Sequence, residues 1–275
     1  MAPTLARYRP LVAELVKRIR DHNLTVQAAG IAFYALLAIP AVAVALLSLY
    51  GLVADPRDIR NQIESNLSGL SESSRSVIIE QLEGITSSSS GGLATGLVVG
   101  VALALWTASG AMVKIFNTLN TVYELSERRK FVALRLRALV LTFGAIAFIA
   151  TAAFLLAALP AVVADTGLGG PVRWLVNTLR FPALLVAMTY GLAILYRLGP
   201  DRRTERHRLR LRGPVAATVL WLVASGLFSV YTANFGSYNE TYGTLGGVVL
   251  VLLWLWLTAL MVLVGAEIDD LVEKR

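Results

Sequence analysis

Cysteine is absent from this sequence, and histidine is nearly so, with only His22 and His207. Without thiols the chain can form no disulfide and do no thiolate chemistry, and two histidines argue against a cluster of metal ligands. Charge is also scarce: 16% of the 275 residues are charged and 56% are hydrophobic, whereas ~25% of a soluble domain is charged. This shortage is typical of a chain whose solvent is mostly hydrocarbon. The sequence therefore predicts an integral membrane protein without a metal or another cofactor.

Long runs without a charged residue follow one another along the chain. The run Thr244–Ala266 has 23 residues, enough to cross a bilayer as one helix, which needs ~20 residues at about 1.5 Å each. Similar runs predict six transmembrane helices in a membrane domain over residues 26–270. The expected spans are about 26–53, 93–119, 138–164, 176–197, 213–235 and 244–267. The predicted fold is all-α, a polytopic integral membrane protein.

Basic residues are distributed unevenly between the segments that join these spans. With the N-terminus inside, 19 of the 25 Lys and Arg residues fall in cytoplasmic segments and five in outer ones. Membrane proteins retain positive charge on the cytoplasmic side. The sequence therefore predicts a multi-pass membrane protein with the N and C termini both cytoplasmic.

The segments outside the spans have recognisable patterns of their own. Residues 1–25 predict a basic amphipathic helix, either lying on the membrane surface or packed against the protein's own cytoplasmic side. Residues 55–92 predict a helical outer loop with two short apolar stripes. The cytoplasmic loop 197–212 holds seven arginines, and residues 268–275 form a cytoplasmic tail.

Three ionisable residues stand inside or beside the predicted spans, namely Lys114, Arg180 and Glu267. Such groups cost about 2.5–3.5 kcal/mol to insert and are functional candidates by default. Lys114 and Glu267 lie near the cytoplasmic ends of their spans, at similar depth. We expect them to pair and close the inner side, or else to reach the interface separately. Arg180 either reaches the interface or faces the protein interior.

Polar, aromatic and proline residues supply the other candidates for substrate binding or gating, in a cavity lined by spans 1, 2, 4 and 6. The stretch 234–247 either re-enters the membrane as a broken helix or forms an ordinary outer turn. Three candidates of the second span follow at intervals of three residues and are expected to share one face. The candidates are Tyr34 and Pro40 in the first span, Trp106, Asn117, Asn120 and Tyr123 in or just after the second, and Asn234, Tyr238, Asn239, Tyr242 and Gly243 before the sixth.

Several motifs resemble those of one known family. They are Tyr34–Pro40, LWTASGAM at 105–112, LNTVYE at 119–124, GPVAATVLW at 213–221, NETYGTLGG at 239–247 and LVGAEID at 263–269. Together they resemble the YihY/virulence factor BrkB family over nearly the whole chain. Ile39 departs from the pattern, because the family often has an aromatic residue there. Members were formerly labelled ribonuclease BN, and others are linked to serum resistance or to envelope lipid biology. The resemblance therefore implies a multi-pass protein of the bacterial inner membrane with a role at the cell envelope.

The residues do not support the ribonuclease label. Metal-dependent cleavage needs carboxylates or histidines clustered around divalent ions, and here the acids are scattered. We therefore expect no enzyme but a transporter-like protein that moves or binds a lipid or another amphiphile. An ion or small-solute channel is the second reading and a structural scaffold the third. The expected partners are membrane lipids, with anionic headgroups at Arg197–Arg212. A homo-oligomer is left open, and no nucleic acid is expected.

Overall fold

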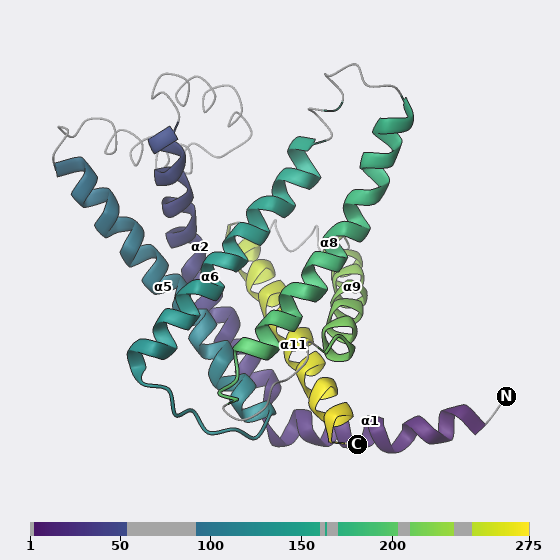
Figure 1. Cartoon of the computed structure of the whole chain (residues 1–275). Helices are drawn as coiled ribbons and strands as arrows, with labels where there is room; N and C mark the ends of the chain where they lie inside the picture. The colour runs from purple at the N-terminus through teal and green to yellow at the C-terminus, as the bar shows by residue number, and fades with distance from the viewer. Residues whose placement is uncertain are drawn as a thin grey trace. The chain divides into compact units, whose positions relative to one another are not determined.

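The computed structural model describes residues 3–53, 92–159, 163, 170–202, 210–233 and 244–274. These residues form helices joined by short connections, with no strand among them. The elements are α1 (Pro3–Asp21), α2 (Leu24–Val53), α5 (Gly92–Val122), α6 (Phe131–Ala153) with its π-helical continuation η1 (Phe154–Ala158), α8 (Gly170–Leu198), α9 (Arg212–Ala233) and α11 (Thr244–Glu273) (Figure 1). A helix thus lies in the described part of each range in which the sequence predicts a span.

Four of the described helical stretches are long and apolar enough to cross a membrane. They are Phe131–Leu156, Trp174–Leu198, Arg212–Ala233 and Gly246–Glu273. The pair Pro10–Asp21 and Leu24–Pro40 passes the same test as one unit but is bent by 57°, which gives up to five candidates. The chain is therefore an all-helical membrane protein with four to five candidate spans in its described part.

The chain divides into two compact units, residues 1–36 with 111–275 and residues 37–110. Helices α2 and α5 each contribute residues to both units.

Two turns with left-handed backbone end helices of the first unit and set the direction of the chain. Asn23 (φ 50°) stands between α1 and α2, and Glu124 (φ 54°) follows α5. After α5 the backbone N–H of Leu125 donates to the carbonyl of Asn120, and that of Glu124 donates to Thr121. This pair of hydrogen bonds is typical of the C-terminal end of a helix. The first turn directs α1 across the end of α2, and the second places the polar end of α5 beside α11.

Helices α9 and α11 pack closely because small residues face each other. A Cβ added to Gly265 of α11 would lie 2.4 Å from the Cβ of Ala217 on α9. A Cβ added to Gly213 would lie 2.4 Å from that of Asp269. Two motifs of the sequence, GPVAATVLW and LVGAEID, therefore meet at this contact. Tyr196 of α8 donates a hydrogen bond to the carbonyl of Val262 and joins a third helix to the pair.

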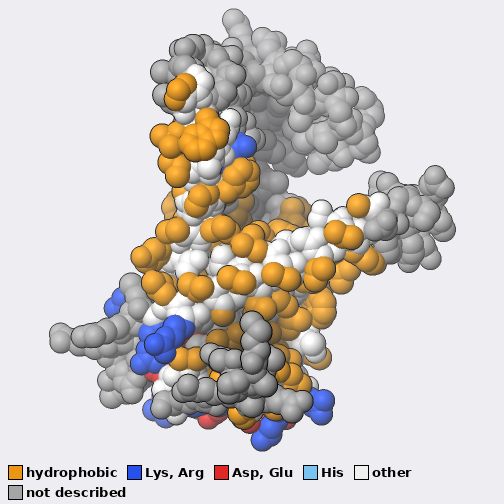
Figure 2. Space-filling model, turned by 90° about the vertical axis from the view of Figure 1, so that its right-hand side faces the viewer, with side chains coloured by type: hydrophobic (Ala, Val, Ile, Leu, Met, Phe, Trp, Pro, Cys, Tyr) orange, Lys and Arg blue, Asp and Glu red, His pale blue; other side chains and the backbone are white. Residues whose placement is uncertain are grey.

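The outer surfaces of the helices are apolar. Phe143 on α6 and Leu227 on α9 are among many large hydrophobic side chains that are more than half exposed. On the face seen in Figure 2, hydrophobic side chains cover the described helices and charged side chains gather mainly at one end. Such an arrangement is costly in water and favourable in lipid.

Candidate functional site

The last two turns of α11 carry four acidic residues, and three of them are buried. Glu267 is fully buried, while Asp269 and Asp270 are 6% and 3% exposed. An ionised carboxylate removed from water is costly unless it is paired and hydrogen-bonded. The partners of these acids therefore determine what this end of the molecule can do.

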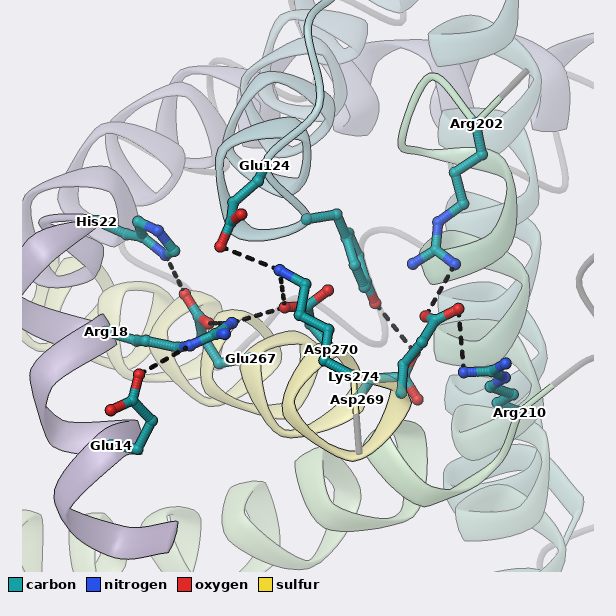
Figure 3. A network of polar contacts seen from close by, with 12 residues as sticks. Glu14, Arg18, His22, Glu124, Arg202, Arg210, Glu267, Asp269, Asp270 and Lys274 are labelled. Atoms are coloured by element: carbon teal, nitrogen blue, oxygen red, sulfur yellow. Dashed lines mark hydrogen bonds and ion pairs between the residues drawn. The ribbon is translucent and has the colours of Figure 1, made fainter. Parts of the chain in front are cut away.

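The buried carboxylate of Glu267 is bound by one residue of α1 and one residue of the turn that follows it. Its Oε1 forms a hydrogen bond with Nδ1 of His22 in the turn, and its Oε2 lies 3.6 Å from Nη1 of Arg18 in the last turn of α1. Figure 3 shows both side chains pointing toward the end of α11. The C-terminal end of α1 and the turn after it therefore contact the end of α11.

Asp270 extends the cluster in the other direction. Its Oδ2 lies 2.6 Å from Nη1 of Arg18 and 2.9 Å from Nζ of Lys274. Lys274 also lies 3.0 Å from Oε1 of Glu124, the residue that ends α5. Hydrogen bonds and charge attraction from Asp270 and Glu124 outweigh partial burial and raise the pKa of Lys274. This series of alternating charges connects α1, α11 and the end of α5.

Asp269 faces the opposite side of α11. The hydroxyl of Tyr123 donates to its Oδ2 over 3.2 Å. The guanidinium of Arg202, just after α8, lies over the ring of Tyr123 with Cζ 4.0 Å from the centroid. Glu273 then binds Arg202 at 3.4 Å and Arg210 at 3.1 Å. The connection between α8 and α9 is thereby held to the end of α11.

Asn120, at the end of α5, joins two loops. Its Nδ2 donates to Oε2 of Glu127 over 2.8 Å, and its Oδ1 accepts from the backbone N–H of Asp201 over 2.8 Å. Arg129 binds both carboxylate oxygens of Glu127 and donates to the carbonyl of Gly199 over 2.8 Å. The hydrogen bonds from Arg129 lower the pKa of Glu127 to about 2, against the opposing effect of partial burial. Glu127 thus remains ionised at any physiological pH.

These contacts form one cluster at the end of the first unit, which we call the charged end. It consists of Glu14, Arg18, His22, Tyr123, Glu124, Arg202, Arg210, Glu267, Asp269, Asp270, Glu273 and Lys274 (Figure 3). It contains six acids and four arginine or lysine residues, and most of the acids lie against a basic side chain. Within the described ranges, no group of three or more His, Asp or Glu is placed to hold a metal ion. The arrangement can hold helices together and can respond to the loss or gain of a charge.

The expected pair of Lys114 and Glu267 does not form. Glu267 binds His22 and Arg18 instead, and the aliphatic part of Lys114 lies against Gly30, where an added Cβ would be 3.0 Å from Cε. The reason is direction around the helix: similar depth does not make two side chains face each other, and Glu267 faces α1.

The three candidates at the end of the second span do not share one environment. Asn120 and Tyr123 are buried in the contacts above, whereas Asn117 is exposed. Three residues turn a helix by about 300°, so the face drifts from one candidate to the next. Among the others, Tyr34 is 44% and Trp106 47% exposed, and α2 continues through an exposed Pro40.

We expected the Arg180 side chain either to reach the membrane interface or to face the protein interior, and neither description fits it fully. Its side chain is half-buried, and Nη1 donates to the carbonyl of Leu156 in η1 over 3.0 Å. The guanidinium thus contacts the neighbouring helix rather than a buried interior. The candidates Asn234, Tyr238, Asn239, Tyr242 and Gly243 lie outside the described residues, as does most of the outer loop 55–92.

Sequence reasoning missed most of the charged end. Arg18, His22, Asp270 and Arg202 were not among its candidates. A signal existed, because Glu14, Arg18 and His22 recur at intervals of four, and Glu267, Asp270 and Glu273 recur at intervals of three. Two helices with complementary charges on one face each are a pattern of helix pairing, although the sequence does not say which pairs form.

The long apolar helices with exposed hydrophobic side chains define this molecule as a helical membrane protein. The profile of the family described as "Virulence factor BrkB" matches residues 15–275. The chain belongs to that family, which confirms the resemblance carried by its motifs. No solved structure matches it.

Relatives with similar sequences carry two kinds of name. The "Putative ribonuclease-like protein YfkH" of Bacillus subtilis (strain 168) is 30% identical over 275 residues, 95% of this chain and 94% of that protein. A "UPF0761 membrane protein" of Chromohalobacter salexigens is 28% identical over 269 residues, 95% of this chain and 63% of the relative. One of Alteromonas mediterranea is 26% identical over 275 residues, 97% and 88% of the two chains. These names describe membrane proteins and, in one case, a ribonuclease-like protein.

Proposed function

We propose that this protein is a transporter of the bacterial inner membrane that moves a lipid or another amphiphile in envelope biogenesis. In this proposal it crosses the membrane six times, both termini are cytoplasmic, and a cavity lies between spans 1, 2, 4 and 6. The charged end then lies at the cytoplasmic side, where the excess of basic residues belongs.

The buried Glu267 is the observation that supports the proposal most. It stands at the end of a long apolar helix, and its partners come from the last turn of α1 and the turn directly after it. Helix α1 runs crosswise to that helix (Figure 1). Transport by alternating access needs a closure that forms on one side of the membrane and opens again. Ion pairs between a span and a peripheral helix suit such a closure, because rotation of α1 would break them together.

The composition of the spans favours an amphiphile over a hydrated ion. Residues 138–164 contain no charge at all, and α8 contains one charged residue between Trp174 and Tyr196. Polar side chains in the spans bind each other, as Thr189 does with Thr218 at 3.1 Å. Few groups are left to replace the hydration shell of an ion, whereas acyl chains need none.

The proposal does not include the ribonuclease activity that the name of one relative suggests. Nucleic-acid cleavage by metal ions needs acids clustered around the metal, whereas no such group of three or more lies among the described residues. The loop Arg197–Arg212 is proposed to contact anionic headgroups. Arg202 and Arg210 are engaged with Glu273, so the exposed Arg197 and Arg212 are the described residues best placed for this contact.

Lipid scrambling in proteoliposomes tests the proposal. Fluorescent phospholipids in both leaflets are bleached from outside with a membrane-impermeant reductant, and the bleached fraction reports exchange between leaflets. We expect wild-type protein to raise the bleached fraction above one half and Glu267→Gln to change the rate at least several-fold. Glu124→Gln is the matched control, because its carboxylate is largely exposed. Ion or solute flux without lipid exchange would favour a channel, and neither activity would leave a scaffold.

A further inference from the structure

Arg180 is a charge without a counter-charge on its own helix or on the run of α6 that it contacts. It is the single charged residue between Trp174 and Tyr196, and residues 138–164 contain neither Asp nor Glu. A guanidinium stays protonated at physiological pH, and an uncompensated charge within hydrocarbon is costly. Arg180 therefore needs an anion that these two segments do not supply.

The contacts of Arg180 hold its guanidinium in place. Nη1 donates to the carbonyl of Leu156, 3.0 Å away. Leu156 lies in η1, the π-helical continuation of α6, so its carbonyl places a neutral acceptor beside the guanidinium. Cζ lies 4.9 Å from the centroid of the Phe181 ring. Both partners are uncharged, so the contacts position the guanidinium without neutralising it.

The surface around this guanidinium is apolar and open. Large hydrophobic side chains more than 40% exposed surround it on both helices, namely Phe154, Leu156, Leu179 and Phe181. Trp174 lies six residues earlier on α8 and is also exposed. Exposed tryptophans gather where hydrocarbon meets the headgroups. A cation held on an apolar surface near the headgroups is complementary to a molecule with an anionic head and long apolar chains.

We propose that Arg180 binds the phosphate of an anionic phospholipid whose acyl chains lie along α6 and α8. Guanidinium and phosphate form charge-assisted hydrogen bonds, and the planar fork of arginine fits phosphate oxygens. The site lies at the end of the membrane opposite the charged end. It depends on the proposed placement of α6 and α8 across the bilayer and does not depend on transport.

A single fluorescent label beside Arg180 tests the site, since the chain has no cysteine to remove. Leu179→Cys is labelled and reconstituted into vesicles that contain phosphatidylcholine and phosphatidylglycerol, one of which carries a quenching group on its acyl chain. The ratio of quenching by the two lipids gives their relative affinity at this position. We expect about a fivefold preference for phosphatidylglycerol, the factor that one basic residue contributes near a lipid surface.

Substitutions in the labelled protein show which residue causes the preference for phosphatidylglycerol. Arg180→Gln should abolish it, and Arg180→Lys should keep a large part of it. Arg137→Gln is the matched control, because it removes an exposed arginine from the other end of α6 and should leave the preference unchanged. A parent protein without preference, as expected if Asp165 or another acid of the chain neutralises Arg180, would overturn the site. An unchanged preference in Arg180→Gln would do the same.

Two further measurements separate related explanations. Loss of the preference in excess inorganic phosphate would assign the site to free phosphate and overturn its assignment to a lipid. A preference that persists in phosphate supports the lipid. Scrambling in the same vesicles keeps the two proposals apart: lipid preference without scrambling contradicts transport alone, and scrambling without preference contradicts the Arg180 site alone.

Discussion

His22 and Glu267, which are 245 positions apart in the sequence, form a hydrogen bond that joins α1 to the end of α11. Glu267 is fully buried, and Arg18 is its second partner. A carboxylate in such a place depends on its partners for compensation, because water cannot reach it. The docking of α1 and the charge of Glu267 therefore depend on each other.

His22→Ala should lower the free energy of unfolding by about 1–3 kcal/mol, since it leaves a buried acceptor without its hydrogen bond. Titration with SDS in mixed micelles measures this quantity. In a double-mutant cycle with Glu267→Gln we expect a coupling energy of about 0.5–3 kcal/mol. Lys17→Ala, at an exposed position of the same helix, is the control and should show no coupling. Additive effects of His22→Ala and Glu267→Gln would mean that the bond does not stabilise the protein.

Close packing of α9 on α11 leads to a second prediction. In Gly265→Ala the new Cβ would lie 2.4 Å from that of Ala217 and 2.8 Å from Oη of Tyr196. The helices must separate, at a cost of about 1–3 kcal/mol, as in other overpacked cores. Gly144→Ala on α6 is the matched control, because nothing lies within 4 Å of the added Cβ. It should be neutral, or more stable by up to about 1 kcal/mol through helix propensity. Equal stability of the two variants would show that the contact can relax without cost.

The sequence was sufficient to predict the helices but not their partners. Uncharged runs mark where a helix can lie in lipid, and a helix lies in the described part of each of the six ranges. Glu267 was also predictable as a functional candidate, because it is a charge at the end of a long apolar run. Its partner was not: Lys114 has the right charge and depth, but the direction of a side chain around its helix depends on how the helices pack. That packing is determined by small residues such as Gly265, which appear in the sequence only as a motif.

Asn120 is a case in which a sequence candidate acquires a different explanation. It was predicted to bind substrate or to gate, together with Asn117. Its amide instead joins Glu127 to the backbone of Asp201. Polar groups that connect two loops are structural by this geometry, and a substrate would have to displace one of these bonds to reach the amide.

Asn120→Ala should therefore lower the free energy of unfolding by about 1–3 kcal/mol, because it leaves buried polar groups unpaired. Asn117→Ala removes the same amide from an exposed position of the same helix and should change stability by no more than about 0.5 kcal/mol. SDS titration of both variants measures the difference. An Asn120→Ala protein of wild-type stability that no longer scrambles lipid would restore the substrate-binding role of this residue.

Glu127 gives a prediction on pH. Its carboxylate accepts hydrogen bonds from Arg129, which lower its pKa from 4.5 to about 2. A carboxyl whose pKa is lower in the folded state stabilises that state above its unfolded pKa, and this contribution is lost as pH falls through the folded pKa. The stability of wild type should therefore fall between pH 4.5 and about 2 more steeply than that of Glu127→Gln, measured as thermal unfolding in detergent. Arg129→Gln should remove the same part of the pH dependence, because it removes the cause of the shift. If the stability curves of wild type and Glu127→Gln stay parallel through this pH range, the hydrogen bonds from Arg129 do not lower the pKa of Glu127. The hydrogen bond that joins Asn120 to Glu127 would then be weaker than its geometry indicates.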